Sequence, residues 1–225
     1  MMGFEPTTLG TTNRCSNQLS YTYRLSLSRV QIYENLNYKS LFYVFFLFLS
    51  LIRLNAKMML HTELIVNEFK RRVFDESYTR IYKCLSLIEE KDLWLTPNTN
   101  TPSIGSLILH VCGNGRQWIL SGLGSKKDNR ERDNEFLKHA NIKKADLIFI
   151  LENLKVNILT ELNALNDQKL SETVRIQGFN ETTYSVLIHV IEHFSYHTGQ
   201  ISTLTKILTD KDLGYYKNLD LNTKS

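Results

Sequence analysis

The sequence predicts an all-α protein that folds as a four-helix bundle. Between about residues 60 and 210, apolar residues recur at helical spacing in four separate stretches, each long enough for a bundle helix. Polar connections that contain proline, glycine or asparagine separate these stretches. The chain has no phosphate loop, no dinucleotide fingerprint, no nucleophile elbow and no internal repeat. Four amphipathic helices around one apolar core are typical of a four-helix bundle.

The first 57 residues do not share this pattern. Residues 1–24 are polar and have neither a helical nor a strand period. The string from Gly3 to Tyr21 is similar to a transfer-RNA gene translated on its reverse strand, as occurs in over-extended gene predictions. We therefore interpret residues 1–57 as an extension from a mis-annotated start, without a fold, and expect translation to begin at Met58 or Met59.

Residues 41–52 of this extension form the apolar run LFYVFFLFLSLI. A helix needs about 20 apolar residues to span a bilayer, and this run has twelve. It also begins too far from the N-terminus for a signal peptide and lacks a small-residue cleavage site. A membrane-proximal anchor is the alternative interpretation; we prefer the mis-annotated start and expect no membrane partner.

The net charge of +4 is located in the extension. Residues 1–57 hold six basic and two acidic residues, and residues 58–225 hold 21 of each. This neutral balance argues against nucleic acid as the main partner. The three cysteines, Cys15, Cys84 and Cys112, are too few and too scattered for a disulfide framework, which favours the cytoplasm.

The first two bundle helices flank a proline-containing loop. An apolar stripe predicts the first helix from Leu60 to about Lys91. The loop from Pro97 to Pro102 follows, and Ser103 is the expected N-cap of a second helix that ends near Leu123. The connection to the third helix, residues 122–134, contains a mixed-sign charge run that is typical of solvated surface.

The third helix is predicted from Lys144 to about Leu165. Residues 173–178 alternate weakly between apolar and polar, which indicates a short extended piece. Thr182 or Thr183 caps the fourth helix, which ends near Thr209. The bundle therefore covers residues 58–210, and we expect residues 211–225 to be a frayed polar tail.

The fourth helix carries His189, His193 and His197 at four-residue spacing, which places all three on one face. A buried imidazole needs a hydrogen-bond partner, a charge partner or a metal. From this stretch alone, a metal site and a histidine-rich solvent face are equally supported. Gln200, on the same face, is placed to hold a ring nitrogen or a metal-bound water. Gly199, in mid-helix, indicates close approach of another backbone or a ligand.

The second helix places His110 on one face with Leu107, Asn114 and Trp118. A lone histidine on an apolar face is more often a core residue than a ligand, and the spacing does not decide between them. Asn114 either bonds a ligand histidine or caps a loop, and Trp118 is expected in the core. Cys112 points about 200° away from His110 and is expected to be a small core residue.

Three segments together resemble the DinB-like superfamily, most closely its branch of uncharacterised bacterial proteins: Ser103 to Asn114 with Gln117-Trp118-Ile119, Arg130 to Phe136, and His193 to Gln200. The resemblance covers about residues 59–210. It implies a four-helix bundle, often a homodimer, with a divalent metal that is commonly zinc or nickel. Carried over by position, the implied ligands are His110, His193 and His197; His189 has no settled role.

Three imidazoles leave a fourth coordination position open for water or substrate, as in catalytic zinc sites. Characterised members of the superfamily are similar to thiol-dependent transferases and isomerases, and others are proposed hydrolases. The resemblance thus implies a metal-dependent thiol S-transferase or hydrolase that uses a low-molecular-weight thiol and a small-molecule substrate. The alternative is a non-catalytic bundle, stabilised by its metal, in stress response or partner binding, so enzymatic activity stays open.

Two further expectations concern charged residues near this site. Arg130 and Arg132 either bind the carboxylates of a thiol or pair with Asp133 or Glu135, and we prefer the pairing. No acidic base is expected beside the histidines, because Glu192 lies about 100° around the helix from His193. That absence favours thiol transfer over hydrolysis.

Overall fold

The computed structural model describes residues 39–53, 61–124 and 126–224. The chain divides into two compact units, Met1–Lys57 and Met58–Ser225. In the first unit, residues 39–53 form a helix, and every one of them is exposed. The sequence analysis expected no fold in this extension and did not predict this helix. Among the described helices, none combines the length and apolar character needed to cross a membrane. The transfer-RNA-like string and the proposed start at Met58 or Met59 lie outside the described residues.

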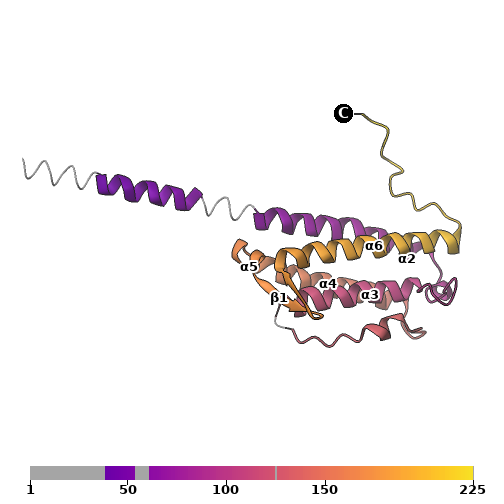
Figure 1. Ribbon diagram of the computed structural model, residues 1–225. Coiled ribbons are helices and arrows are strands. Elements are labelled where there is room, and N and C mark those ends of the chain that lie inside the picture. The colour runs from indigo at the N-terminus through magenta and orange to yellow at the C-terminus, as the bar shows by residue number, and fades with distance from the viewer. Residues whose placement is uncertain (1–38, 54–60, 125, 225) are drawn as a thin grey trace, which may run out of the picture. The chain divides into compact units, whose positions relative to one another are not determined.

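The second unit is built from four long helical segments, so the predicted all-α bundle is confirmed (Figure 1). The first comprises residues 61–70, the π-helical η1 (Arg71–Tyr78) and α2 (Thr79–Leu87). The second comprises α3 (Ile104–Gly115) and the π-helical η3 (Arg116–Ser121), the third is α4 (Lys144–Asn163), and the fourth is α6 (Thr183–Thr209). Helix α6 packs against α2 and α3, and α3 also packs against α4.

The helix ends follow local capping chemistry. The hydroxyl of Ser103 accepts a hydrogen bond from the backbone N–H of Ser106 at the start of α3. Thr182 does the same for Ser185 at the start of α6. Such caps satisfy backbone donors that a helix cannot pair internally. Both predicted N-caps are confirmed, as is the end of α6 at Thr209.

Tyr78 connects three of the helical segments in the bundle core. The ring of Tyr78 stacks on Phe194 of α6, with centroids 5.7 Å apart. Its hydroxyl donates a 3.1 Å hydrogen bond to the backbone carbonyl of Leu151 in α4. A buried tyrosine hydroxyl requires such a partner, and this bond fastens the first helix to the third.

Shorter elements connect the helices: η2 (Glu90–Asp92), η4 (Arg132–Phe136), α5 (Asp167–Ser171), β1 (Thr173–Ile176) and β2 (Phe179–Thr182). The predicted extended piece is β1, and the prediction missed its antiparallel partner β2. Gln177 and Gly178 form the turn with φ of 52° and 87°. Two successive residues at positive φ match the twist of a tight hairpin.

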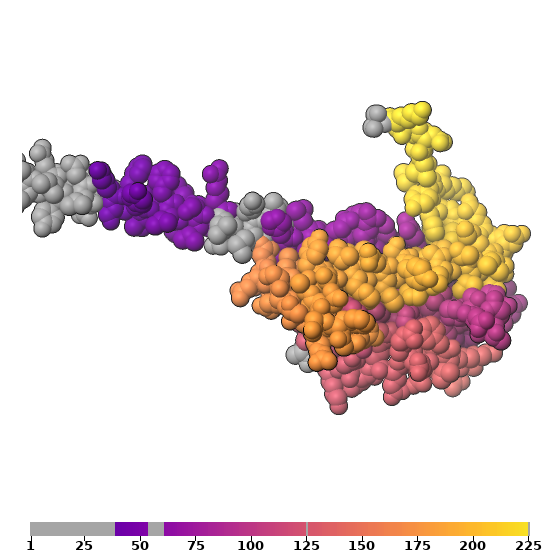
Figure 2. All heavy atoms as spheres, viewed as in Figure 1, coloured from indigo at the N-terminus to yellow at the C-terminus, as the bar shows by residue number. Residues whose placement is uncertain are grey.

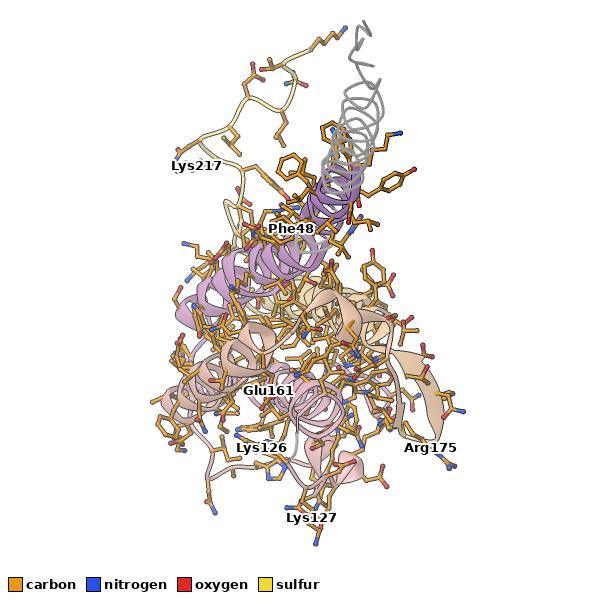
Figure 3. The ribbon with its side chains drawn as sticks, turned by 90° about the vertical axis from the view of Figure 1, so that its left-hand side faces the viewer. Phe48, Lys126, Lys127, Glu161, Arg175 and Lys217 are labelled. Atoms are coloured by element: carbon orange, nitrogen blue, oxygen red, sulfur yellow. The ribbon has the colours of Figure 1, made fainter. Side chains whose placement is uncertain are left out.

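The charge run before η4 was expected on the surface. Lys127 of this run is exposed and points away from the bundle, which agrees with that expectation (Figure 3).

The segment after α6 corrects the expectation of a frayed tail. Leu213 is 4% exposed, and the hydroxyl of Tyr215 lies 2.7 Å from the hydroxyl of Ser202 and 3.3 Å from Sγ of Cys84. A buried leucine and a hydrogen-bonded tyrosine dock the first part of this segment on the bundle. The chain that follows runs away from the bundle, where Lys217 lies (Figures 2 and 3).

Candidate metal centre

Three histidines from two helices meet at one point of the bundle. His110 comes from α3, and His193 and His197 come from successive turns of α6. One potential ligand nitrogen from each lies within 4.8 Å of the others. The ring of His110 lies 4.9 Å from that of His193 and 4.8 Å from that of His197, between centroids. The structure therefore brings together the three residues that the sequence analysis singled out.

Two of these rings are oriented by acceptors on their outer nitrogens. Nδ1 of His110 lies 2.8 Å from Oε2 of Glu135, and Nδ1 of His197 lies 2.7 Å from Oε1 of Gln200. Carboxylate and amide oxygens accept, so each Nδ1 carries the proton and each Nε2 keeps a free lone pair. This is the pattern by which proteins orient metal-binding histidines. The expected role of Gln200 in holding a ring nitrogen is confirmed.

His193 is the unsatisfied member of the cluster. Its Nε2 is buried and has no hydrogen-bond partner among the described residues. Burial, together with the neighbouring His197 and His110, lowers its pKa from 6.5 to about 3. The ring is therefore neutral at physiological pH. A buried, unpaired nitrogen beside two imidazoles with free lone pairs fits a divalent metal ion.

Glu135 corrects the expectation that no acidic residue lies beside the histidines. Besides His110, it accepts hydrogen bonds from Nε and Nη2 of Arg130 at 2.7 and 2.9 Å. The two side chains are 11% and 4% exposed. Burial raises the pKa of Glu135, but the hydrogen bonds from Arg130 and His110 outweigh it, and the net pKa lies below its ordinary value. Glu135 is therefore an ionised positioning residue.

The same ion pair decides between the two expectations for Arg130, because it pairs with Glu135 as preferred. Its Nη1 also donates to Oε1 of Gln117 at 2.9 Å, and Gln117 donates to Asp128 at 2.7 Å. Arg130 belongs to a charge run that we expected to be solvated. Its side chain is an exception to that expectation, because it is only 4% exposed. Each of the three nitrogens of its guanidinium donates to Glu135 or Gln117, so Arg130 is held within the protein.

Gly113 makes room for this carboxylate. It lies one turn after His110 on α3, and a Cβ there would fall 1.8 Å from Oε1 of Glu135. Any side chain at this position would displace the carboxylate from His110. From the sequence, Glu135 was expected only as a possible partner of the two arginines, and neither its bond to His110 nor the role of Gly113 was predicted. Both residues lie in segments that carry the family resemblance.

Arg132 lies on the outer side of the cluster. Its guanidinium lies 5.1 Å from the ring centre of Phe136, and that ring lies 4.8 Å from the ring of His110. Arg132 is exposed and forms no ion pair with any residue that the structure describes. Burial is the main cause that lowers the pKa of His197, and the charge of Arg132 contributes. A guanidinium free to bind an anion thus lies near the histidines.

His189, the remaining histidine of the row, does not join the cluster. It stacks on Trp118 with centroids 3.7 Å apart, and Nδ2 of Asn114 donates to its Nε2 at 3.2 Å. Asn114 therefore bonds the one histidine of the row that is not placed as a ligand. Trp118 is buried, as expected. Burial lowers the pKa of His189, so it too is neutral.

Three smaller expectations have outcomes. Burial raises the pKa of Cys112 to about 12, which agrees with an inert core residue. Glu192 is exposed, as expected. Of the two expectations for Gly199, the close approach of another backbone is wrong, because a Cβ there would meet no described atom within 4 Å. The approach of a ligand stays a prediction. Gly199 instead lies on the wall of a surface cavity.

The fold and the site together define a DinB-like four-helix bundle with a three-histidine cluster between two helices. The chain belongs to the family described as Protein of unknown function (DUF1572), whose model matches residues 63–220. This family match confirms the predicted place in the DinB-like superfamily. No protein with a curated description matches the sequence.

Solved structures also resemble the chain, among them the following two. One is a conserved protein from Enterococcus faecalis, 15% identical, with a TM-score of 0.52 over 67% of this chain and 98% of that one. The other is a DinB-like protein from Bacillus cereus ATCC 10987, 16% identical, with a TM-score of 0.49 over 60% of this chain and 87% of that one. At these identities, the Enterococcus likeness concerns the fold alone.

Proposed function

We propose that His110, His193 and His197 hold a divalent metal, zinc or nickel, with a fourth position open, and that the protein is a metal-dependent thiol S-transferase. The buried, unpaired Nε2 of His193 is the observation that carries this proposal. Empty of a metal, the cluster would bury a polar atom at a cost of about 1–3 kcal/mol. A bound divalent ion lowers the pKa of a coordinated thiol or water and so supplies a nucleophile near neutral pH.

Glu135 supports thiol transfer rather than hydrolysis. Both its oxygens accept hydrogen bonds from Arg130 or His110, and its pKa is lowered, so it orients His110 and is a poor proton acceptor. Activation of water starts from a pKa of about 15.7 and gains most from a free base. A thiol starts from about 8.5 and needs no such base.

Arg132 would bind the thiol substrate through a carboxylate. Arginine matches carboxylate geometry with two parallel donors, and this guanidinium is free and near the histidines. In the reaction, the thiol sulfur forms a bond to an electrophilic carbon. That carbon releases its leaving group with the bonding electron pair, and the thiol proton passes to solvent.

Metal content and activity of matched histidine variants test this proposal. The chain from Met58 would be purified without a histidine tag, and its zinc and nickel measured by mass spectrometry. We expect about one ion per chain in the wild type and in His189→Ala, and loss of the ion in His193→Ala. Cysteine or glutathione with chlorodinitrobenzene would then measure thiol transfer.

The two variants distinguish the ligand role from a general effect on the helix, because both remove an imidazole from the same face of α6. Equal metal content in the two variants would contradict the three-histidine site. A second outcome would favour the non-catalytic bundle instead. In that case the wild type contains a metal but is inactive, and its cobalt-substituted form does not bind azide.

A further inference from the structure

A surface cavity of about 600 Å³ lies between α6 and the loop before α3, and its lining comes within one helical turn of His110 and His197. Leu107 contributes from α3 and precedes His110 by one turn. Gln200 contributes from α6 and follows His197 by one turn. The lining residues come from the loop before α3, from α3 and from α6: Pro97, Asn98, Thr101, Pro102, Leu107, Tyr196, Gly199, Gln200, Thr203, Leu204 and Ile207.

The chemistry of the lining selects for neutral, apolar molecules. None of the residues that line the cavity is acidic, basic or a histidine. Another cavity of similar size, about 630 Å³ beside the C-terminal segment, is lined by Lys83, Lys206 and Lys217. The volume is within the range of small-molecule sites, which are mostly apolar with a few placed polar groups. A charged molecule would lose its hydration here without gaining a partner.

Gln200 connects the cavity to the cluster. Its Oε1 accepts from Nδ1 of His197, and its Nε2 donates to the hydroxyl of Tyr196 at 3.4 Å. Gln200 and Tyr196 both line the cavity. A molecule in the cavity would therefore touch the side chain that orients one of the three histidines.

Gly199 keeps the cavity open on the side of α6. Glycine weakens a helix interior, and no packing requirement explains it here, because a Cβ would meet nothing within 4 Å of it in the described part of the chain. A longer side chain would instead project along the cavity wall. Glycine at this point therefore adds empty volume next to Gln200.

We infer that this cavity binds the neutral, apolar body of the second substrate, with the electrophilic carbon directed toward the histidines. The inference rests on the proposed function and deepens it, because it names the class of electrophile. Arg132, in η4 and outside the lining of this cavity, then receives the thiol. The two substrates are thus held by different groups, one by charge and one by apolar contact.

Binding of a neutral fluorescent probe tests the cavity without reference to metal or activity. N-phenylnaphthylamine would be titrated into the metal-free protein and into two variants. Gly199→Leu fills the cavity and improves the helix, and we expect it to weaken probe binding at least about tenfold. Ser195→Leu is the matched control, because it adds the same side chain to the exposed side of α6 outside the lining, and its affinity should equal the wild type.

A pair of metal-binding probes tests whether the cavity serves the cluster. Acetohydroxamic acid and octanohydroxamic acid share the same metal-binding head, and their binding to cobalt-substituted protein is followed by visible absorption. The longer chain should bind at least about tenfold more tightly to the wild type, and Gly199→Leu should remove that difference while the affinity for acetohydroxamic acid stays the same.

The outcomes separate this inference from the proposed function. Probe binding that Gly199→Leu leaves unchanged would overturn the inference even if zinc binds. Probe binding that Gly199→Leu abolishes, in a protein that takes up no metal, would support the cavity and refute the proposed function. Loss of a wild-type dimer in Gly199→Leu, without any probe binding, would show that the groove is an interface between copies and would also overturn the inference.

Discussion

Replacing Gly113 by alanine should weaken metal binding although it strengthens the helix. The new Cβ would lie 1.8 Å from Oε1 of Glu135, and ordinary contact begins at 3.4 Å, so the carboxylate must move by about 1.6 Å. A flexible side chain could do this at little cost, but Glu135 is only 11% exposed and holds three hydrogen bonds with Arg130 and His110. It cannot keep all three after such a displacement.

The expected magnitude follows from the loss of an oriented ligand. Removing the partner of a metal-binding histidine weakens metal binding about 10–100-fold, or about 1.4–2.7 kcal/mol. The replacement of glycine by alanine within a helix raises the folding stability by about 1 kcal/mol, so it opposes any general loss of structure. Zinc affinity would be measured by competition with a chromophoric chelator, and the stability of the metal-free protein by urea unfolding.

The control and the double variant make this reasoning refutable. Gly199→Ala makes the same chemical change in the middle of α6, where a Cβ meets nothing within 4 Å in the described structure, and should leave zinc affinity unchanged. Gly113→Ala added to Glu135→Ala should cost no further affinity, because the residue it displaces is already absent. Wild-type zinc affinity in Gly113→Ala would refute the role of Glu135 in holding His110.

Three further predictions follow from the same structure. Folding lowers the pKa of His193 from 6.5 to about 3, so between these pH values the unfolded chain binds more protons than the folded one. The metal-free protein should therefore lose stability as the pH falls from 6.5 toward 3. His193→Ala should flatten this pH dependence of thermal unfolding. Arg132→Gln should raise KM for glutathione about tenfold with little change in kcat. Arg130→Gln should instead lower the free energy of unfolding by about 3–5 kcal/mol, because it leaves Glu135 without its ion-pair partner. Tyr215→Phe should lower the free energy of unfolding by about 1 kcal/mol in urea titration, since it removes the bond to Ser202, and an unchanged value would contradict the docked C-terminal segment.

Most of the bundle could be predicted because its signals are local. Helical periodicity and the caps at Ser103 and Thr182 located the helices to within a few residues. The second strand of the hairpin was missed, since its pairing depends on a turn with Gln177 at positive φ, which glutamine rarely adopts. The docking of Tyr215 was also missed, because its partners in α2 and α6 are distant in the sequence.

The site was predictable in part. The spacing of His193 and His197 placed them on one helical face, and only the family resemblance indicated that His110 would join them. The bond of Glu135 to His110 was missed because the two residues lie 25 positions apart in the sequence, and a carboxylate in a charged loop usually faces solvent. For Arg130, the sequence left two roles open, and only its burial with Glu135 decided between them.

The sequence alone determined the helices, their order and which faces are apolar, because periodicity and capping act over a few residues. It also determined that three imidazoles of α6 lie on one helical face. The tertiary structure decided which groups meet across elements: His110 with the pair on α6, Glu135 with His110 through the space left by Gly113, and the neutral cavity beside Gln200. Contacts between distant segments depend on how whole helices pack, and that information is not contained in any single stretch of the chain.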